Sequence, residues 1–138
     1  MTGSAEVLLD SSSLMLLMKR LGVDLIPKLE RFCTLDLATY EMGNIIWKEA
    51  YLSKRLTTEE ASSLASTTEQ ILTLVERISI SPQDIGRTLE LAQMEGLTFY
   101  DASYLRAAID RKVPLVTEDA KLKRAARKHA IVTGADEL

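Results

Sequence analysis

Four carboxylates of this chain stand where short apolar runs or helical segments begin or end. Asp10 and Asp119 each follow a short apolar run, and Glu41 and Asp101 lie near the beginnings of two segments with helical patterning. Carboxylates that meet repel one another unless a cation neutralises them. A ligand set made only of oxygens selects hard ions such as Mg²⁺ or Mn²⁺. If the four acids converge, they form a divalent-metal centre.

Each acid also has an ordinary structural explanation. Asp10 and Asp119 could cap the helices that follow them, and Glu41 could favour the positive end of a helix dipole. Asp101 fits a capping box with Thr98, three residues earlier. The positions along the chain are therefore compatible with a shared site and do not by themselves prove one.

The segments that must position these acids alternate between short apolar runs and longer helical patterns. We predict strands over residues 6–10, 34–38, 78–80, 113–116 and 130–132. We predict helices over residues 13–21, 24–32, 40–52, 57–76, 81–96, 99–112 and 119–128. Strands separated by helices imply a parallel sheet covered on both faces. The expected fold is α/β, a three-layer sandwich with a central parallel sheet of about five strands, and residues 1–138 form one domain.

Several helix boundaries carry local signals. The serines at residues 11–13 can cap the first helix, and Thr57 with Glu60 forms a capping box. Ser81 followed by Pro82 marks another helix start.

The order of elements predicts where the acids meet. In open parallel sheets, ligands bind beyond the carboxyl ends of the strands. Asp10 ends the first strand, Glu41 lies in the first turn of the helix after the second, and Asp119 follows the fourth. Asp101 joins them if its helix begins at the same edge of the sheet.

Composition narrows the class of protein. The 138 residues carry a net charge of −3. This charge argues against a protein that binds nucleic acid over its whole surface. The single cysteine, Cys33, is expected to be a small buried hydrophobe. There is no apolar run of membrane-spanning length and no signal pattern, so we expect a soluble, cytoplasmic protein with no membrane partner.

The sequence motifs around the four acids resemble those of a known protein family. The segments are VLLDSSSL, TYEMGNIIWK, FYDASYLRAA and LVTEDAKLKRAA, in that order, between residues 7 and 122. They are similar to the motifs of the PIN-domain family, in particular the compact ribonuclease toxins of VapC-type toxin–antitoxin pairs. The third residue of the first motif is Ser12 where many members carry Asn, and Glu118 adds an acid beside Asp119.

The resemblance implies a metal-dependent endoribonuclease that hydrolyses RNA phosphodiester bonds. Asp10 and Asp101 would be the central ligands of Mg²⁺ or Mn²⁺, with Glu41 and Asp119 binding a second ion or a metal-held water. The hydroxyl side chains near these carboxylates would hold them in place by hydrogen bonds, although each also fits an ordinary turn or cap. They are Ser12 and Thr117.

A basic helix begins at Asp119 and offers contacts for RNA phosphates. Its first turns carry Lys121, Lys123 and Arg124, the best candidates to touch substrate, although a solvated helix face has the same composition. The only histidine, His129, lies at the far end of this helix and is not expected to act as a base.

The resemblance also implies partners. In such toxins an antitoxin segment occupies a groove and blocks the acidic site, and the toxin forms a homodimer. Trp47, Tyr51 and residues 14–18 are apolar enough for such a groove, but packing in the core is the default expectation for them.

Two alternatives keep the same fold. One is a PIN nuclease of RNA maturation or decay, and the other is a non-catalytic RNA-binding module, against which the intact acids argue. Other α/β enzymes fit poorly. A phosphatase with an aspartyl nucleophile needs Asp-x-Asp after the first strand, and Ser12 stands at its second acid; a receiver domain needs paired acids there, and Ser11 interrupts the pair. The chain also lacks the G-x-S-x-G elbow of a Ser–His–Asp hydrolase and a glycine loop that binds phosphate.

Overall fold

A parallel β-sheet forms the middle layer of the molecule. The computed structural model describes residues 5–129 and 132–134, and in this part the strand order is β3-β2-β1-β4-β5 with every neighbouring pair parallel. The strands are β1 (Val7–Leu9), β2 (Phe32–Leu35), β3 (Glu76–Ile78), β4 (Leu115–Val116) and the two-residue edge strand β5 (Val132–Thr133). The predicted α/β class with a parallel sheet is confirmed.

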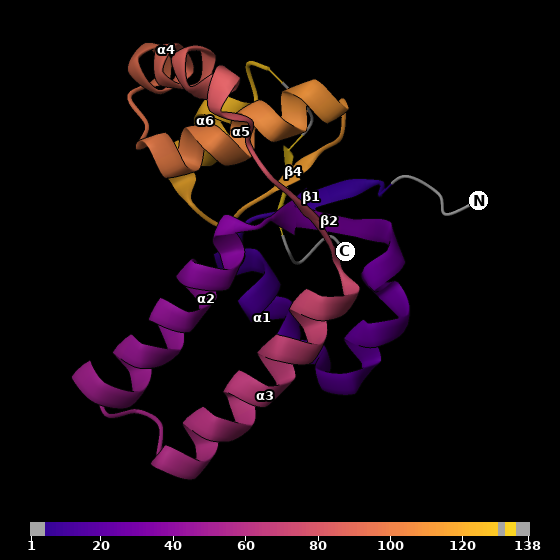
Figure 1. Ribbon diagram of the computed structural model, residues 1–138, viewed down its shortest axis with the longest axis vertical. Helices are drawn as coiled ribbons and strands as arrows, with labels where there is room; N and C mark the ends of the chain where they lie inside the picture. Colours follow the sequence, from indigo (N-terminus) through magenta and orange to yellow (C-terminus); the bar gives the residue numbers. More distant parts are fainter. Residues whose placement is uncertain (1–4, 130–131, 135–138) are drawn as a thin grey trace.

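Helices cover both faces of the sheet (Figure 1). One face carries α1 (Ser11–Leu21), the 3₁₀ segment η1 (Gly22–Arg31), α2 (Leu37–Trp47), which continues as the π-helical turn η2 (Lys48–Leu52), and α3 (Thr58–Leu74). The other face carries α4 (Ile85–Glu95), which follows the 3₁₀ turn η3 (Pro82–Asp84), α5 (Phe99–Arg111) and α6 (Ala120–Ala126). No helix in the described ranges is long and apolar enough to cross a bilayer.

Alternating strand residues build the two halves of the core. Leu8 and Leu115 are fully buried among α4, α5 and α6, whereas Leu9 and Val116 are fully buried among α1, α2 and α3. Successive side chains of a strand point to opposite faces, so each two-residue step supplies one side chain to each layer. Cys33 joins the α5 side and is buried, as predicted.

The predicted boundaries were wrong by two or three residues around β2 and β3. β2 covers residues 32–35 rather than 34–38, α2 begins at Leu37 rather than 40, and β3 covers residues 76–78 rather than 78–80. Pairing decides these limits, because Cys33 aligns with both Leu8 of β1 and Glu76 of β3. Of the predicted strand 130–132, residues 130 and 131 lie outside the described residues.

Other local expectations also need correction. The cap of α1 is Asp10 rather than the serines at residues 11–13, because its carboxylate is the group that reaches a backbone N–H of the first turn. Residues 24–32 do not form an α-helix. They belong mostly to η1, where Pro27 lacks the N–H that an α-helix needs.

The apolar residues expected in the core divide into two groups. Leu14, Met15, Leu17 and Met18 of α1 are buried. Trp47 and Tyr51, however, are 46% and 69% exposed, because the end of α2 projects beyond the sheet with α3.

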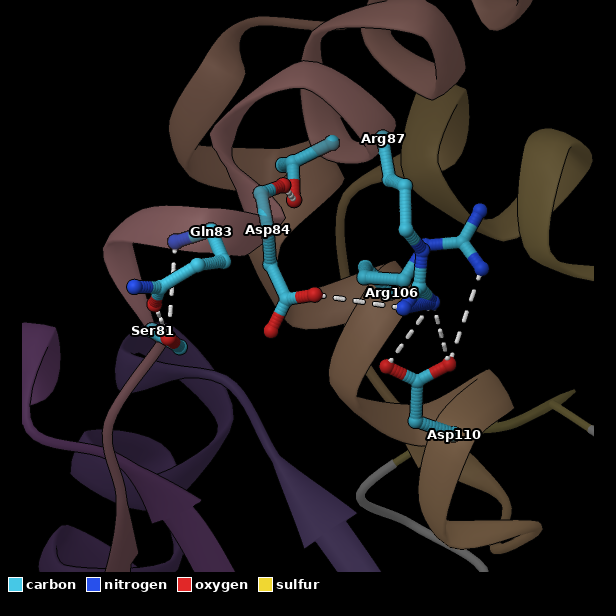
Figure 2. A network of polar contacts seen from close by, with 7 residues as sticks. Ser81, Gln83, Asp84, Arg87, Arg106 and Asp110 are labelled. Atoms are coloured by element: carbon cyan, nitrogen blue, oxygen red, sulfur yellow. Dashed lines mark hydrogen bonds and ion pairs between the residues drawn. The ribbon is translucent and has the colours of Figure 1, made fainter.

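An ion-pair network joins α4 to α5 (Figure 2). Arg87 of α4 donates from Nη2 to both carboxylate oxygens of Asp110 on α5, at 2.9 and 3.1 Å, and from Nη1 to Asp84 at 3.2 Å. Arg106 lies one turn before Asp110, with Nη1 3.6 Å from the same carboxylate. The network therefore helps to fix the orientation of α5, the helix that begins near Asp101.

Replacing the shared carboxylate should weaken this connection modestly. We expect Asp110→Asn to lower the free energy of unfolding by about 0.5–1 kcal/mol, because the ion pairs are half-exposed and screened by water. Urea unfolding at low and high salt checks this, with the exposed Asp24→Asn as control. A loss of several kcal/mol, or one that does not shrink in high salt, would contradict it.

Candidate metal centre

The four acids come from four elements whose ends meet at the carboxyl edge of the sheet. Asp10 directly follows β1, and Asp119 follows β4 and caps α6. Asp101 lies in the first turn of α5. Glu41 lies in the second turn of α2 rather than in its first, because that helix begins earlier than predicted.

Asp10 is held by donors from two directions. Its Oδ1 accepts the backbone N–H of Ser13 at 2.9 Å, and its Oδ2 accepts the hydroxyl of Thr117 at 2.6 Å. Burial raises the pKa of Asp10 above its usual 3.8, hydrogen bonds from Thr117 and Ser13 lower it, and the charge of Asp119 raises it. The carboxylate is thus fixed in orientation, and its negative charge is poorly solvated.

Thr117 links two of the acids. The side chain is fully buried, and its Oγ1 donates to Asp10 while accepting the backbone N–H of Asp119 at 3.1 Å. Asp119 in turn accepts the N–H of Leu122 through Oδ1 at 2.8 Å. Each capping bond occupies part of a carboxylate that has about four lone-pair sites. A helix cap and a place in the acidic cluster are therefore compatible.

Asp101 shows that the acids lie within electrostatic reach of one another. Its backbone N–H donates to Thr98 Oγ1 at 3.1 Å, as expected for the cap of α5. Burial raises the pKa of the Asp101 carboxyl most, followed by the negative charges of Asp119, Asp10 and Glu41. All three other acids therefore act on this one group.

Glu41 has a partner that the sequence did not reveal. Its Oε1 accepts the hydroxyl of Tyr104 at 2.7 Å, and Tyr104 is 1% exposed. Burial and Glu41 both raise the pKa of the Tyr104 phenol, so it remains a donor at neutral pH. The spacing of three residues from Asp101, one helical turn, was the available signal, because it puts both side chains on one face of α5.

Ser12 does not hold a carboxylate as predicted. Its side chain is exposed, and it makes no hydrogen bond to the acids in the part of the chain described. The first residues of α1 turn Ser12 outward, and the N–H of Ser13 reaches Asp10 instead.

The donor set fits a hard dication in its chemistry. Within residues 5–129 and 132–134, no three Asp, Glu, His or Cys side chains are grouped so that they could hold an ion in this conformation. Burial is the main cause of the raised pKa values of Asp10 and Asp101, and repulsion from the charges of neighbouring acids raises both further. An ion at this edge would relieve that repulsion, and it requires the side chains to move toward it.

The basic residues divide by position. The Lys121 ammonium lies over Gly96, in the turn before α5, 3.9 Å from where a Cβ on that glycine would stand. Lys123 pairs with Glu118 at 3.3 Å, and Arg124 is exposed. His129 contacts Glu95 at 2.6 Å, at the end of α4. Lys121 therefore lies against the turn between α4 and α5, the helix that carries Asp101.

Residues 7–128 match the family described as PIN domain. The chain belongs to the PIN-domain family. "Exonuclease VapC9" of Pyrobaculum aerophilum is 34% identical over 93 residues, which cover 67% of this chain and 65% of that protein. The match thus spans about two thirds of the relative's own length.

Two solved structures share the fold. PAE2754 from Pyrobaculum aerophilum is 30% identical, with a TM-score of 0.79 over 96% of this chain and 92% of that one. FitAcB from Neisseria gonorrhoeae has a TM-score of 0.66 over 96% of this chain and 99% of that one, at 18% identity, and supports the fold alone.

The raised pKa of Asp101 makes stability depend on pH. Because the folded state binds this proton more tightly than the unfolded state, the group's stabilising contribution is fully present below about pH 3.8. It is lost as the pH rises through the folded-state pKa. At neutral pH without metal, the Asp101 charge therefore destabilises this PIN domain.

Asp101→Asn should consequently stabilise the metal-free protein at pH 7, because it removes the charge and keeps the shape. Urea unfolding in chelator should show a higher midpoint than wild type at pH 7 and no such gain at pH 3.5. The exposed Asp24→Asn is the control and should show little change. A lower midpoint for Asp101→Asn at pH 7 would contradict the clustering of the acids.

Proposed function

We propose that this PIN-domain protein is a divalent-metal-dependent endoribonuclease that hydrolyses RNA phosphodiester bonds. Asp10, Glu41, Asp101 and Asp119 would hold Mg²⁺ or Mn²⁺. The observation that carries the proposal is the placement of the acids at the carboxyl edge of the sheet, where the Thr117 hydroxyl bonds both the Asp10 carboxylate and the backbone N–H of Asp119. The charges of the other three acids, which raise the pKa of Asp101, support it. Membership of the PIN family and the VapC9 relative support nuclease chemistry over a purely structural cluster.

The residues of the proposed site would have different roles in cleavage. When bound, the ion supplies an activated water and neutralises charge on the scissile phosphate. Thr117 and the Ser13 N–H keep Asp10 oriented through their hydrogen bonds. The Lys121 ammonium lies above the turn before α5 and would attract a neighbouring RNA phosphate. Lys123 and Arg124 would contribute farther along α6.

A protein partner forms the second part of the proposal. We infer that the chain is the toxin of a toxin–antitoxin pair and forms a homodimer, on the strength of its VapC-type relative. A groove of about 340 Å³ between α2 and α3 is lined by apolar Ile46, Ala65 and Leu72 among others. Such a groove suits an amphipathic antitoxin segment. A role in RNA maturation or decay would need no such partner.

The mode of cleavage is a separate question, because the relative's name describes that protein as an exonuclease. A circular RNA has no ends, so only an endonuclease can cut it. Circular and linear forms of one RNA, given Mn²⁺, Mg²⁺ or chelator, therefore distinguish the two modes directly.

We expect the purified protein to cut both forms with either ion and neither form in chelator. Asp101→Asn should lower the rate at least about 100-fold, since it removes a ligand of the ion. Asp24→Asn removes the same kind of charge from an exposed position of η1 outside the acidic cluster; it is the matched control and should keep wild-type activity.

Each contrary result has its own meaning. Cleavage of linear RNA alone would replace the endonuclease proposal with exonuclease activity. Binding of RNA without cleavage would favour the non-catalytic module. Full activity of Asp101→Asn would remove the four acids as the site.

A further inference from the structure

Glu41 differs from Asp10 and Asp119 in how its carboxylate is held. Asp10 and Asp119 cap helices and accept backbone N–H groups through Oδ1. Glu41 lies inside α2, where the backbone N–H groups are used by the helix, and its side chain is half-buried. Its hydrogen-bond partner among the described residues is the hydroxyl of Tyr104.

The bond from Tyr104 connects the two helical layers. α2 packs against one face of the sheet and α5 against the other, so the hydrogen bond passes over the carboxyl edge where the acids gather. A glutamate has three side-chain torsions, and fixing such a long polar side chain costs conformational entropy. Burial already fixes Tyr104. Its hydrogen bond therefore restricts Glu41 before an ion binds, which reduces the entropy that ion binding must cost.

We propose that Tyr104 is a positioning residue that holds Glu41 toward the other three acids and thereby raises the affinity of the site for a divalent cation. The inference rests on the proposed metal site. Tyr104 donates to Oε1, which leaves Oε2 and the second lone pair of Oε1 for the cation. Tyr104 touches neither ion nor substrate in this role, and acts only through Glu41.

The same tyrosine also fills the core on the α5 side, together with Leu105 and Leu35. If Tyr104 only packed in the core, Tyr104→Phe would leave the affinity for the ion nearly unchanged, because phenylalanine keeps the ring. The hydroxyl is therefore the group to remove. Tyr100→Phe, one turn earlier on α5 and 59% exposed, removes a hydroxyl outside the core and is the matched control.

Calorimetric titration with Mn²⁺ at pH 7 tests the proposal without any RNA. We expect Tyr104→Phe to weaken Mn²⁺ binding by about 10-fold, the usual effect of removing a group that orients a ligand. Tyr100→Phe should bind as wild type does. Glu41→Gln should bind more weakly, and adding Tyr104→Phe to it should cause no further loss, because the tyrosine acts through Glu41.

The outcomes separate the two proposals. Failure of wild type to bind Mn²⁺ would end the proposed metal site itself. Wild-type affinity in Tyr104→Phe, or an equal additional loss in the Glu41→Gln background, would overturn the positioning role while leaving the metal site intact.

A second measurement applies even if Tyr104→Phe does not fold. Mn²⁺ binding at Glu41 should perturb the ultraviolet absorption of the hydrogen-bonded Tyr104, and the perturbation should vanish in Glu41→Gln. An unchanged tyrosine spectrum in wild type at saturating Mn²⁺ would overturn the proposal.

Discussion

Repulsion among carboxylates is the constraint on which the site depends. The charges of Asp10, Glu41 and Asp119 all raise the pKa of Asp101, and burial adds to the cost of keeping these groups ionised. The fold withstands the repulsion because neutral donors hold several of the acids in place, among them Thr117 on Asp10 and Tyr104 on Glu41. Such a cluster is stable enough to form, and the proposed dication would relieve its repulsion.

Sheet topology explains why these acids lie at one edge of the sheet. β1 lies between β2 and β4, so Asp10 emerges beside Thr117 and Asp119, and the chain from β2 leads into α2 with Glu41. α5 returns the chain to β4, which requires its first turn, with Asp101, to lie at the carboxyl edge. One order of strands therefore gathers groups that are up to 109 positions apart, from Asp10 to Asp119.

The sequence alone allowed prediction of the features that depend on local helix and strand signals and on the parallel order of the strands. The apolar run before Asp10, the cap at Thr98 and the alternation of strands and helices indicated the α/β class and one edge for the acids. It did not allow prediction of strand register or of contacts between side chains far apart in the chain, because tertiary packing determines both. No local pattern gives the register that begins β2 at Phe32, and no pattern links Tyr104 to Glu41, 63 residues away. Ser12 failed as a predicted contact because its side chain is exposed, and the group that reaches Asp10 is the backbone N–H of Ser13.

A titration of the Asp101 carboxyl by NMR, with and without Mg²⁺, tests the central claim most directly. Without the ion, Asp101 should titrate above its usual pKa of 3.8, and saturating Mg²⁺ should lower that pKa, because the cation stabilises the charged form. An Asp101 that titrates at its ordinary value without the ion, and does not respond to it, would contradict both the gathering of the acids and the proposed metal site.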